Sequence, residues 1–287
     1  MSENFMYDFG DGNGIVEARR HSKGGGIVAL TAAVADTAYI GEDARVFGKA
    51  KVSDNALVNG NARVFGNARI FNDARVNGNA WVYGDAQVSG KAQVRGSVWV
   101  YDNAKVHGNS WVDGNAQVFE NAKVFGNARI LGNTKVSGNV AVFGNAKVFG
   151  NAWVYGDTQV CDSARVFGDA RVYGNSWVYG KARIFGKAQV YENAQVFGDA
   201  KVCGNSWVSD KAQVCGNSWV SENARVFGDA RVYGNSWVYG DAQVSGNAKV
   251  YGNAWVYEDA RILENAEIYG DMKVLSNIPG NEQMPSV

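Results

Sequence analysis

The sequence predicts an all-β protein that folds as a single-stranded parallel β-helix of about 14 triangular coils. The first observation behind this prediction is a six-residue repeat of the form [N/D]-[A/S]-x-[V/I]-x-G, as in residues 61–66, Asn-Ala-Arg-Val-Phe-Gly. The second is the regularity of the repeat. Starting at Val34, every sixth residue up to Val274 is Val or Ile, which makes 41 consecutive positions without an insertion or a deletion. Internal repeats of this kind indicate a solenoid.

Each hexad predicts one short strand and one corner. The small residue and the aliphatic residue two positions later lie on the same face of a strand, and a β-branched side chain suits a buried, pleated surface. The Gly and Asn/Asp that follow tolerate positive φ, so the chain can turn. The pattern never reverses as it does in a hairpin meander. Successive turns should therefore stack in parallel, with three hexads, or 18 residues, in each coil.

The two ends depart from the repeat. The predicted organisation is an irregular N-terminal cap at 1–25, the β-helix at 26–276, and a C-terminal tail or cap at 277–287. The open first coil exposes strand edges that need a cover, and Phe5, Phe9 and Ile15 are predicted to supply it. The alternative for the glycine-rich N-terminal segment is a phosphate-binding loop, but it lacks a GxxxxGK[ST] motif and a following helix.

Composition argues against several functional classes. Lys+Arg and Asp+Glu both number 28, so a formal charge of zero provides no bulk attraction to nucleic acid or anionic membrane. The chain has no apolar run long enough for a membrane-spanning helix, and its acidic N-terminus does not resemble a secretory signal. Cys161, Cys203 and Cys215 have no CxxC spacing, which argues against a disulfide framework or a zinc site. We therefore predict a cytoplasmic protein without metal or cofactor.

The outward positions carry most of the variation between repeats. Of the 41 residues that lie between the small and the aliphatic positions, 19 are Lys or Arg, 9 are Trp and 8 are Gln. Acidic residues instead gather in the corners, which hold 21 of the 28. Either the charges neutralise one another along a solvated surface, or the faces form an extended binding surface. The position after the aliphatic residue is aromatic 22 times, and such columns are predicted to stiffen a corner.

All nine Trp residues occupy the outward position, and some are spaced by one coil. Trp219, Trp237 and Trp255 should stack on one face, as should Trp81 and Trp99 on another. Exposed aromatic side chains can bind a partner protein or a glycan, because large exposed apolar patches usually mark an interface. They can equally reinforce the sheet as same-face pairs. These five residues are the predicted binding residues.

The register of Val64-Phe65-Gly66-Asn67-Ala68-Arg69 resembles the hexapeptide-repeat, left-handed β-helix superfamily, which includes bacterial acyltransferases and γ-class carbonic anhydrases. The resemblance extends from about residue 32 to residue 275. It implies a left-handed coil, whereas the period alone also allows a right-handed coil of the bactofilin type. Trimers are common in the superfamily. The sequence shows no trimer-specific loop, so monomer, dimer and trimer all stay open, and a homo-oligomer is possible.

Enzymes of that superfamily place catalytic or zinc-binding His residues on or near the β-helix, and this chain has two His residues. Two are too few for the carbonic anhydrase site. An acyltransferase acting on an acyl-CoA or acyl-carrier donor would need His107 or His21 as a general base, yet no inserted loop walls a substrate site and no C-terminal helical segment follows. Ser110 and Ser206 replace Ala at core-facing positions and are not predicted as nucleophiles.

The first hypothesis is therefore a non-catalytic structural or interaction protein, a rigid β-helical rod that binds a partner protein or a glycan through outward Trp and Arg ladders. The alternative is a hexapeptide-repeat acyltransferase, which rests on the resemblance alone. A nucleic-acid-binding rod is a third, weaker hypothesis, and binding that falls steeply with salt would support it.

Overall fold

The computed structural model describes residues 3–279, so residues 280–287 of the predicted C-terminal tail lie outside the described residues. Between β4 (Ala33–Val34) and β44 (Lys273–Val274), a two-residue strand begins every six residues and ends on the predicted Val or Ile. Residues 3–279 contain no helix. The predicted fold class is confirmed as a parallel β-solenoid of about 14 turns, with 18 residues per turn. The left-handed sense stays a prediction.

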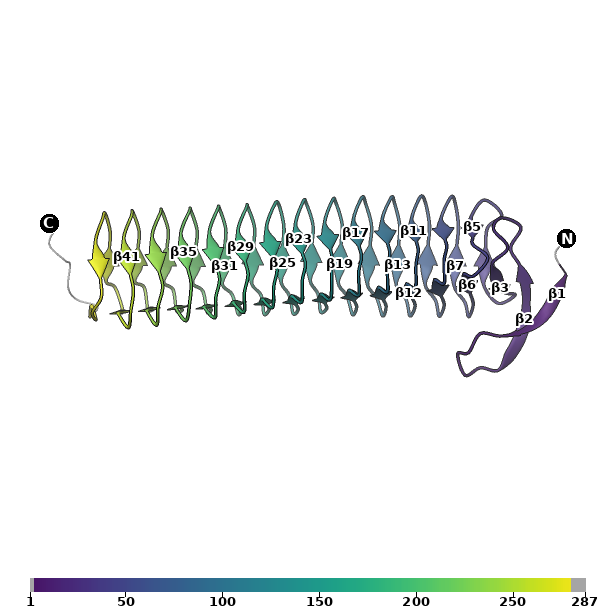
Figure 1. Cartoon of the computed structure of the whole chain (residues 1–287), viewed down its shortest axis with the longest axis horizontal. Helices are drawn as coiled ribbons and strands as arrows, with labels where there is room; N and C mark the ends of the chain where they lie inside the picture. Colours follow the sequence, from purple (N-terminus) through teal and green to yellow (C-terminus); the bar gives the residue numbers. More distant parts are fainter. Residues whose placement is uncertain (1–2, 280–287) are drawn as a thin grey trace. The chain divides into compact units, whose positions relative to one another are not determined.

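The chain forms two compact units, Met1–Gly144 and Asn145–Val287. Every third strand pairs in parallel, so each unit has three sheets. In the first unit, sheet A contains β3 (Ile27–Ala29), β6 (Arg45–Val46) and every third strand to β21 (Lys135–Val136). Sheet B runs from β4 to β22 (Ala141–Val142), and sheet C runs from β5 (Tyr39–Ile40) to β20 (Arg129–Ile130). In the second unit, sheet A runs from β24 (Trp153–Val154) to β42 (Arg261–Ile262), sheet B from β25 (Gln159–Val160) to β43 (Glu267–Ile268), and sheet C from β23 (Lys147–Val148) to β44. Figure 1 shows the strands of each unit stacked coil upon coil.

The core is the column of aliphatic residues together with the small residues beside them. From Ile40 to Ile268, the residue at every predicted aliphatic position is fully buried. Backbone groups pair from coil to coil, as when the Trp237 N–H donates to the Ala254 carbonyl at 2.9 Å. The predicted aromatic columns also form, since the rings of Phe149, Phe167 and Phe185 stack with centroids 4.8 and 5.0 Å apart.

The corners explain where the acidic residues lie. Gly occupies most corner positions with positive φ, but five Glu residues also adopt it, at φ between 56° and 59°. The carboxylates of Glu192 and Glu222, like those of Asp residues at the same position, reach the backbone of the next coil. Glu222 accepts from the Gly240 N–H at 3.0 Å and Asp162 accepts from the Gly180 N–H at 3.1 Å. The carboxylate thus accepts from a backbone N–H of the next corner, which has no such partner where the corner residue is Gly. This hydrogen bond offsets part of the strain of positive φ.

The N-terminal segment is more regular than predicted. β1 (Asn4–Asp8) and β2 (Ile15–Arg20) form an antiparallel hairpin, and β2 pairs with β3 at the edge of sheet A. Figure 1 shows this hairpin, in purple, beside the first coils. Phe9 is buried and its ring stacks on Phe47 at 4.7 Å, as a cover requires, and Phe5 is partly buried. The prediction for Ile15 was wrong, because it is 63% exposed. The strand alternation that buries Val16 against the same cluster turns Ile15 outward.

Buried hydroxyls in the core differ in their partners. The Ser206 Oγ donates to the Cys203 carbonyl at 2.7 Å, whereas the equally buried Ser110 Oγ has no hydrogen-bond partner among the described residues. We expect Ser206→Ala to lower the free energy of unfolding by about 1 kcal/mol, and Ser110→Ala to leave it unchanged or raise it, because only the first loses a hydrogen bond. Denaturant titration of the two variants checks this, and the reverse order would contradict it.

Candidate functional site

In the second unit, the rings of the predicted Trp ladder stack on one another, and a cation covers each end of the stack. Trp219, Trp237 and Trp255 lie on the successive sheet C strands β35 (Trp219–Val220), β38 (Trp237–Val238) and β41 (Trp255–Val256), with ring centroids 4.7 and 5.6 Å apart. The Lys201 Nζ lies 4.0 Å from the centroid of Trp219, and the Lys273 Nζ lies 5.3 Å from that of Trp255. Both faces of every ring are therefore covered by another ring or by a cation, and the ladder presents ring edges to a ligand.

The second predicted pair of Trp residues also stacks, in the first unit. The rings of Trp81 and Trp99, on sheet A of the first unit, stack at 5.6 Å. The Arg63 guanidinium lies 5.2 Å from the centroid of Trp81, on whose edge Phe65 also packs. Trp99 is 40% exposed and pairs with Gln117 on the next strand. The stacking predicted from the 18-residue spacing is thus confirmed, while a binding role for these five Trp residues stays a prediction.

A different Trp has its ring uncovered. Trp177, on β28 (Trp177–Val178) of sheet B, is 46% exposed, more than any other Trp in residues 3–279. Its neighbours on the adjacent strands are Gln159 and Gln195. Across the described residues, no aromatic ring and no cation lies over its indole, whereas the exposed Trp207 has the Arg225 guanidinium 5.0 Å from its centroid.

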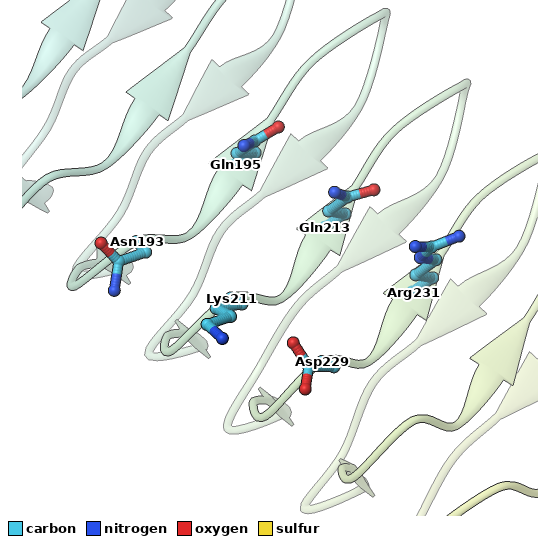
Figure 2. A pocket seen from close by; sticks show the side chains of 6 residues that line it. All are labelled: Asn193, Gln195, Lys211, Gln213, Asp229 and Arg231. Atoms are coloured by element: carbon cyan, nitrogen blue, oxygen red, sulfur yellow. The ribbon is translucent and has the colours of Figure 1, made fainter.

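A polar hollow of about 410 Å³ lies next to Trp177 on the same sheet. Figure 2 shows its lining as two rows on three successive coils, one along the strands and one beside the corners. The first row contains Gln195, Gln213 and Arg231, and the second contains Asn193, Lys211 and Asp229. Gln195 pairs in register with Trp177 and Gln213. The row along the strands therefore continues the row of the exposed indole.

The polar groups of this hollow are available to a ligand. The Asn175 amide donates to Asn193 Oδ1 at 3.4 Å. The other five lining side chains form no hydrogen bond or ion pair within residues 3–279. The hollow thus offers amide, carboxylate and guanidinium groups together, in a mixture of donors and acceptors. Sequence reasoning missed this site, although Trp177 is recognisable as a Trp with Gln residues 18 positions before and after it.

A comparable hollow of about 480 Å³ lies on sheet C of the first unit, lined by Asn55, Leu57, Asp73, Arg75, Lys91 and Gln93. The exposed ring beside it is Tyr39, which pairs in register with Leu57. An apolar side chain thus stands where the hollow next to Trp177 has the Gln195 amide. The Asn55 amide also donates to Asp73 Oδ1 at 3.5 Å, which occupies that carboxylate oxygen.

His21 and His107, the two weak candidates for a general base, have different surroundings. His21 is buried, and its ring nitrogens lie 3.1 Å from the Lys23 carbonyl oxygen and 3.2 Å from that of Ala35, so it fastens the N-terminal turn to the first coil. The ring of His107 stacks on Phe125 at 5.1 Å. Burial, together with the nearby Lys105 and Lys123, lowers the pKa of His107. No carboxylate orients either ring within residues 3–279.

The three cysteine thiols are not activated as nucleophiles. Burial and the Asp162 carboxylate raise the pKa of Cys161 to about 11, and burial raises the pKa of Cys203 and Cys215, so the thiols stay protonated at neutral pH. All three cysteines are free. Within the described residues, no cluster of three or more His, Cys, Asp or Glu side chains could hold a metal ion, and no helix is long and apolar enough to cross a membrane.

Comparisons with solved structures show low similarity. UDP-N-acetylglucosamine acyltransferase from Arabidopsis is 12% identical, over 79% of this chain and 71% of that chain, with a TM-score of 0.24. The enzyme of that name from Campylobacter jejuni is 14% identical over 64% and 68%, with a TM-score of 0.22. UDP-N-acetylglucosamine O-acyltransferase from Moraxella catarrhalis RH4 is 13% identical over 77% and 71%, also with a TM-score of 0.22. At this level of similarity, none of these enzymes indicates an activity for this chain.

The repeat itself matches a known family. Residues 68–84, 164–180, 224–240 and 242–258 each match the YdcK Beta solenoid repeat. No curated protein matches the sequence. The matched segments lie in both units and share the register of the hexads between them. The chain therefore folds as a parallel β-solenoid, and four of its segments are similar to the YdcK Beta solenoid repeat.

Proposed function

We propose that this protein is a non-catalytic β-solenoid that binds a glycan on sheet B of its second unit. The ligand would contact Trp177 and the adjacent polar hollow. The observation that carries the proposal is the exposed indole without a ring or cation over it, in register with a row of amide and guanidinium groups that have no partners.

The chemistry of the site fits a sugar chain. A sugar ring combines an apolar C–H face, which packs on an aromatic ring, with hydroxyls that both donate and accept hydrogen bonds. Pockets for small apolar ligands are instead concave and mostly apolar, whereas this hollow is open and polar. Three successive coils extend roughly 10 Å along the sheet. A short oligosaccharide lying along the coils would therefore contact the indole and the hollow together.

The Trp ladders fit this role less well. The ring faces of Trp219, Trp237 and Trp255 already pack on one another or on cations, so a sugar ring would have to displace a neighbour. Their stacking instead supports a stabilising role between coils, through same-face aromatic pairs. The acyltransferase alternative gains no support from the surroundings of His21 and His107.

Substitution of Trp177 tests the proposal. We expect Trp177→Ala to weaken binding to a panel of neutral oligosaccharides at least about tenfold, because truncating an aromatic anchor removes much of the contact energy. Glycan-array screening followed by calorimetry measures this. Circular dichroism should show an unchanged fold, because the ring lies outside the core.

Two variants serve as controls. Trp237→Ala removes a ring whose faces are covered, and Tyr39→Ala removes the exposed ring beside the comparable hollow of the first unit. Both should bind like the original protein. The proposal is wrong if Trp177→Ala binds normally, if Trp237→Ala alone abolishes binding, or if no glycan of the panel is retained.

A further inference from the structure

A continuous row of cations lies on sheet C of the second unit, on a different face from the Trp177 hollow. Lys147, Arg165, Arg183 and Lys201 occupy the outward positions of β23, β26 (Arg165–Val166), β29 (Arg183–Ile184) and β32 (Lys201–Val202). Each is the direct register partner of the next. We call these four residues the basic ladder.

The basic ladder is not neutralised by the protein. None of its members forms an ion pair within residues 3–279. The nearest acids in sequence do not reach it, since the Asp162 carboxylate accepts from the Gly180 N–H and Asp199 makes no ion pair. At another outward position a Lys is paired with an acid on the next coil: the Lys249 Nζ lies 2.7 Å from the Glu267 Oε1. Like charges directly opposite one another on a sheet are destabilising, so a bound anion would relieve the repulsion.

We propose that the basic ladder binds a linear acidic polysaccharide, one that carries carboxylate or sulfate groups along its chain. The four cations follow one another at a spacing of about 4.8 Å, so successive charges of an extended polyanion can each meet a Lys or Arg. The ladder continues into the Trp219 stack, because Lys201 is the register partner of Trp219. This arrangement suits an extended polymer that lies along the coils more than a compact anion.

Nucleic acid fits the same surface less well. Single-stranded nucleic acid gains much of its affinity from bases stacked on aromatic faces, and the faces of the neighbouring Trp219 are covered by Lys201 and Trp237. Duplex DNA carries a dense charge, which the acidic corners and the zero net charge of the chain oppose. A polysaccharide with sparser charges matches a single row of cations better.

Replacing the whole ladder with Gln tests this proposal. The chain itself carries Gln at eight equivalent outward positions, so the fold should tolerate the change. We expect Lys147→Gln/Arg165→Gln/Arg183→Gln/Lys201→Gln to weaken binding to heparin and to alginate at least about tenfold. In the original protein, log K should fall with log[salt] with a slope of up to about −3, and the variant should lose most of this slope.

The matched control removes the same charge from an interrupted row. In the first unit, Lys51 and Arg69 on sheet B are separated by Gln87 from Lys105 and Lys123. Lys51→Gln/Arg69→Gln/Lys105→Gln/Lys123→Gln should retain nearly full affinity. Equal losses in both variants, tighter binding to oligo-dT than to heparin and alginate, or no binding to either polysaccharide would overturn the proposal. The site is independent of Trp177, so Trp177→Ala should leave heparin binding unchanged.

Discussion

Replacing Ile184 with Ala should lower the free energy of unfolding by roughly 2–5 kcal/mol, the usual cost of removing a large aliphatic side chain from a packed core. Ile184 is fully buried in sheet C of the second unit, and its strand pairs with a strand on each side. A solenoid is stabilised by contacts between neighbouring repeats. The cavity should therefore loosen the coils of Val166 and Val202 first.

Denaturant unfolding measures the size of this effect, and hydrogen exchange maps its location. Protection should fall most in the strands that pair with β29. Ile15→Ala is the matched control, because the same side chain is removed from an exposed position of the hairpin. It should change stability by less than about 0.5 kcal/mol. Equal destabilisation by the two substitutions would contradict the predicted burial of the aliphatic column.

Substitution of a corner glycine should lower the free energy of unfolding nearly as much as substitution of a core residue. Gly114 has φ of +81°, and a Cβ there would lie 2.8 Å from both the backbone N and the O of Gly132 on the next coil. Positive φ costs an L-residue roughly 1–2 kcal/mol, and the backbone contact cannot be relieved by rotating a side chain. We expect Gly114→Ala to lower the free energy of unfolding by roughly 2–4 kcal/mol.

Substitution of Gly12 separates the cost of positive φ from the cost of the close backbone contact. Its φ is +82°, but a Cβ there would meet nothing within 4 Å. Gly12→Ala should therefore cost only the conformational part, roughly 1–2 kcal/mol. Thermal unfolding of both variants checks the difference. If Gly114→Ala were no more destabilising than Gly12→Ala, the close approach between corners would be wrong.

The sequence predicted the coil well because one physical rule repeats in every hexad. A buried Val or Ile such as Val64 leaves the core if the register slips by one residue, so the period alone determines the strand, the pairing and the stacked columns. The same spacing predicted that Trp219 and Trp237 would stack. Short-range patterns of this kind can be derived without any tertiary information.

Other features depend on contacts that the period does not contain. Glu is a poor candidate for positive φ, and only the Gly240 N–H within reach of its carboxylate explains Glu222 at a corner. The regular pairing of β1 with β2 was hidden by the turn-rich composition between them. The accessible faces of a Trp depend on its neighbours one coil away. Those neighbours lie 18 residues away and follow from the period, so Trp177 could have been recognised between Gln159 and Gln195. Sequence reasoning instead looked for stacked Trp residues and selected Trp237.

In the proposed binding mode, the uncovered indole of Trp177, and not the Trp ladder, contacts a glycan. Hydroxyl-radical footprinting read by mass spectrometry tests this directly, because it reports the oxidation of each Trp separately. With neutral oligosaccharides that bind the intact protein, we expect protection of Trp177 and unchanged oxidation of Trp219, Trp237 and Trp255. Protection of the ladder with Trp177 still fully oxidised would contradict it.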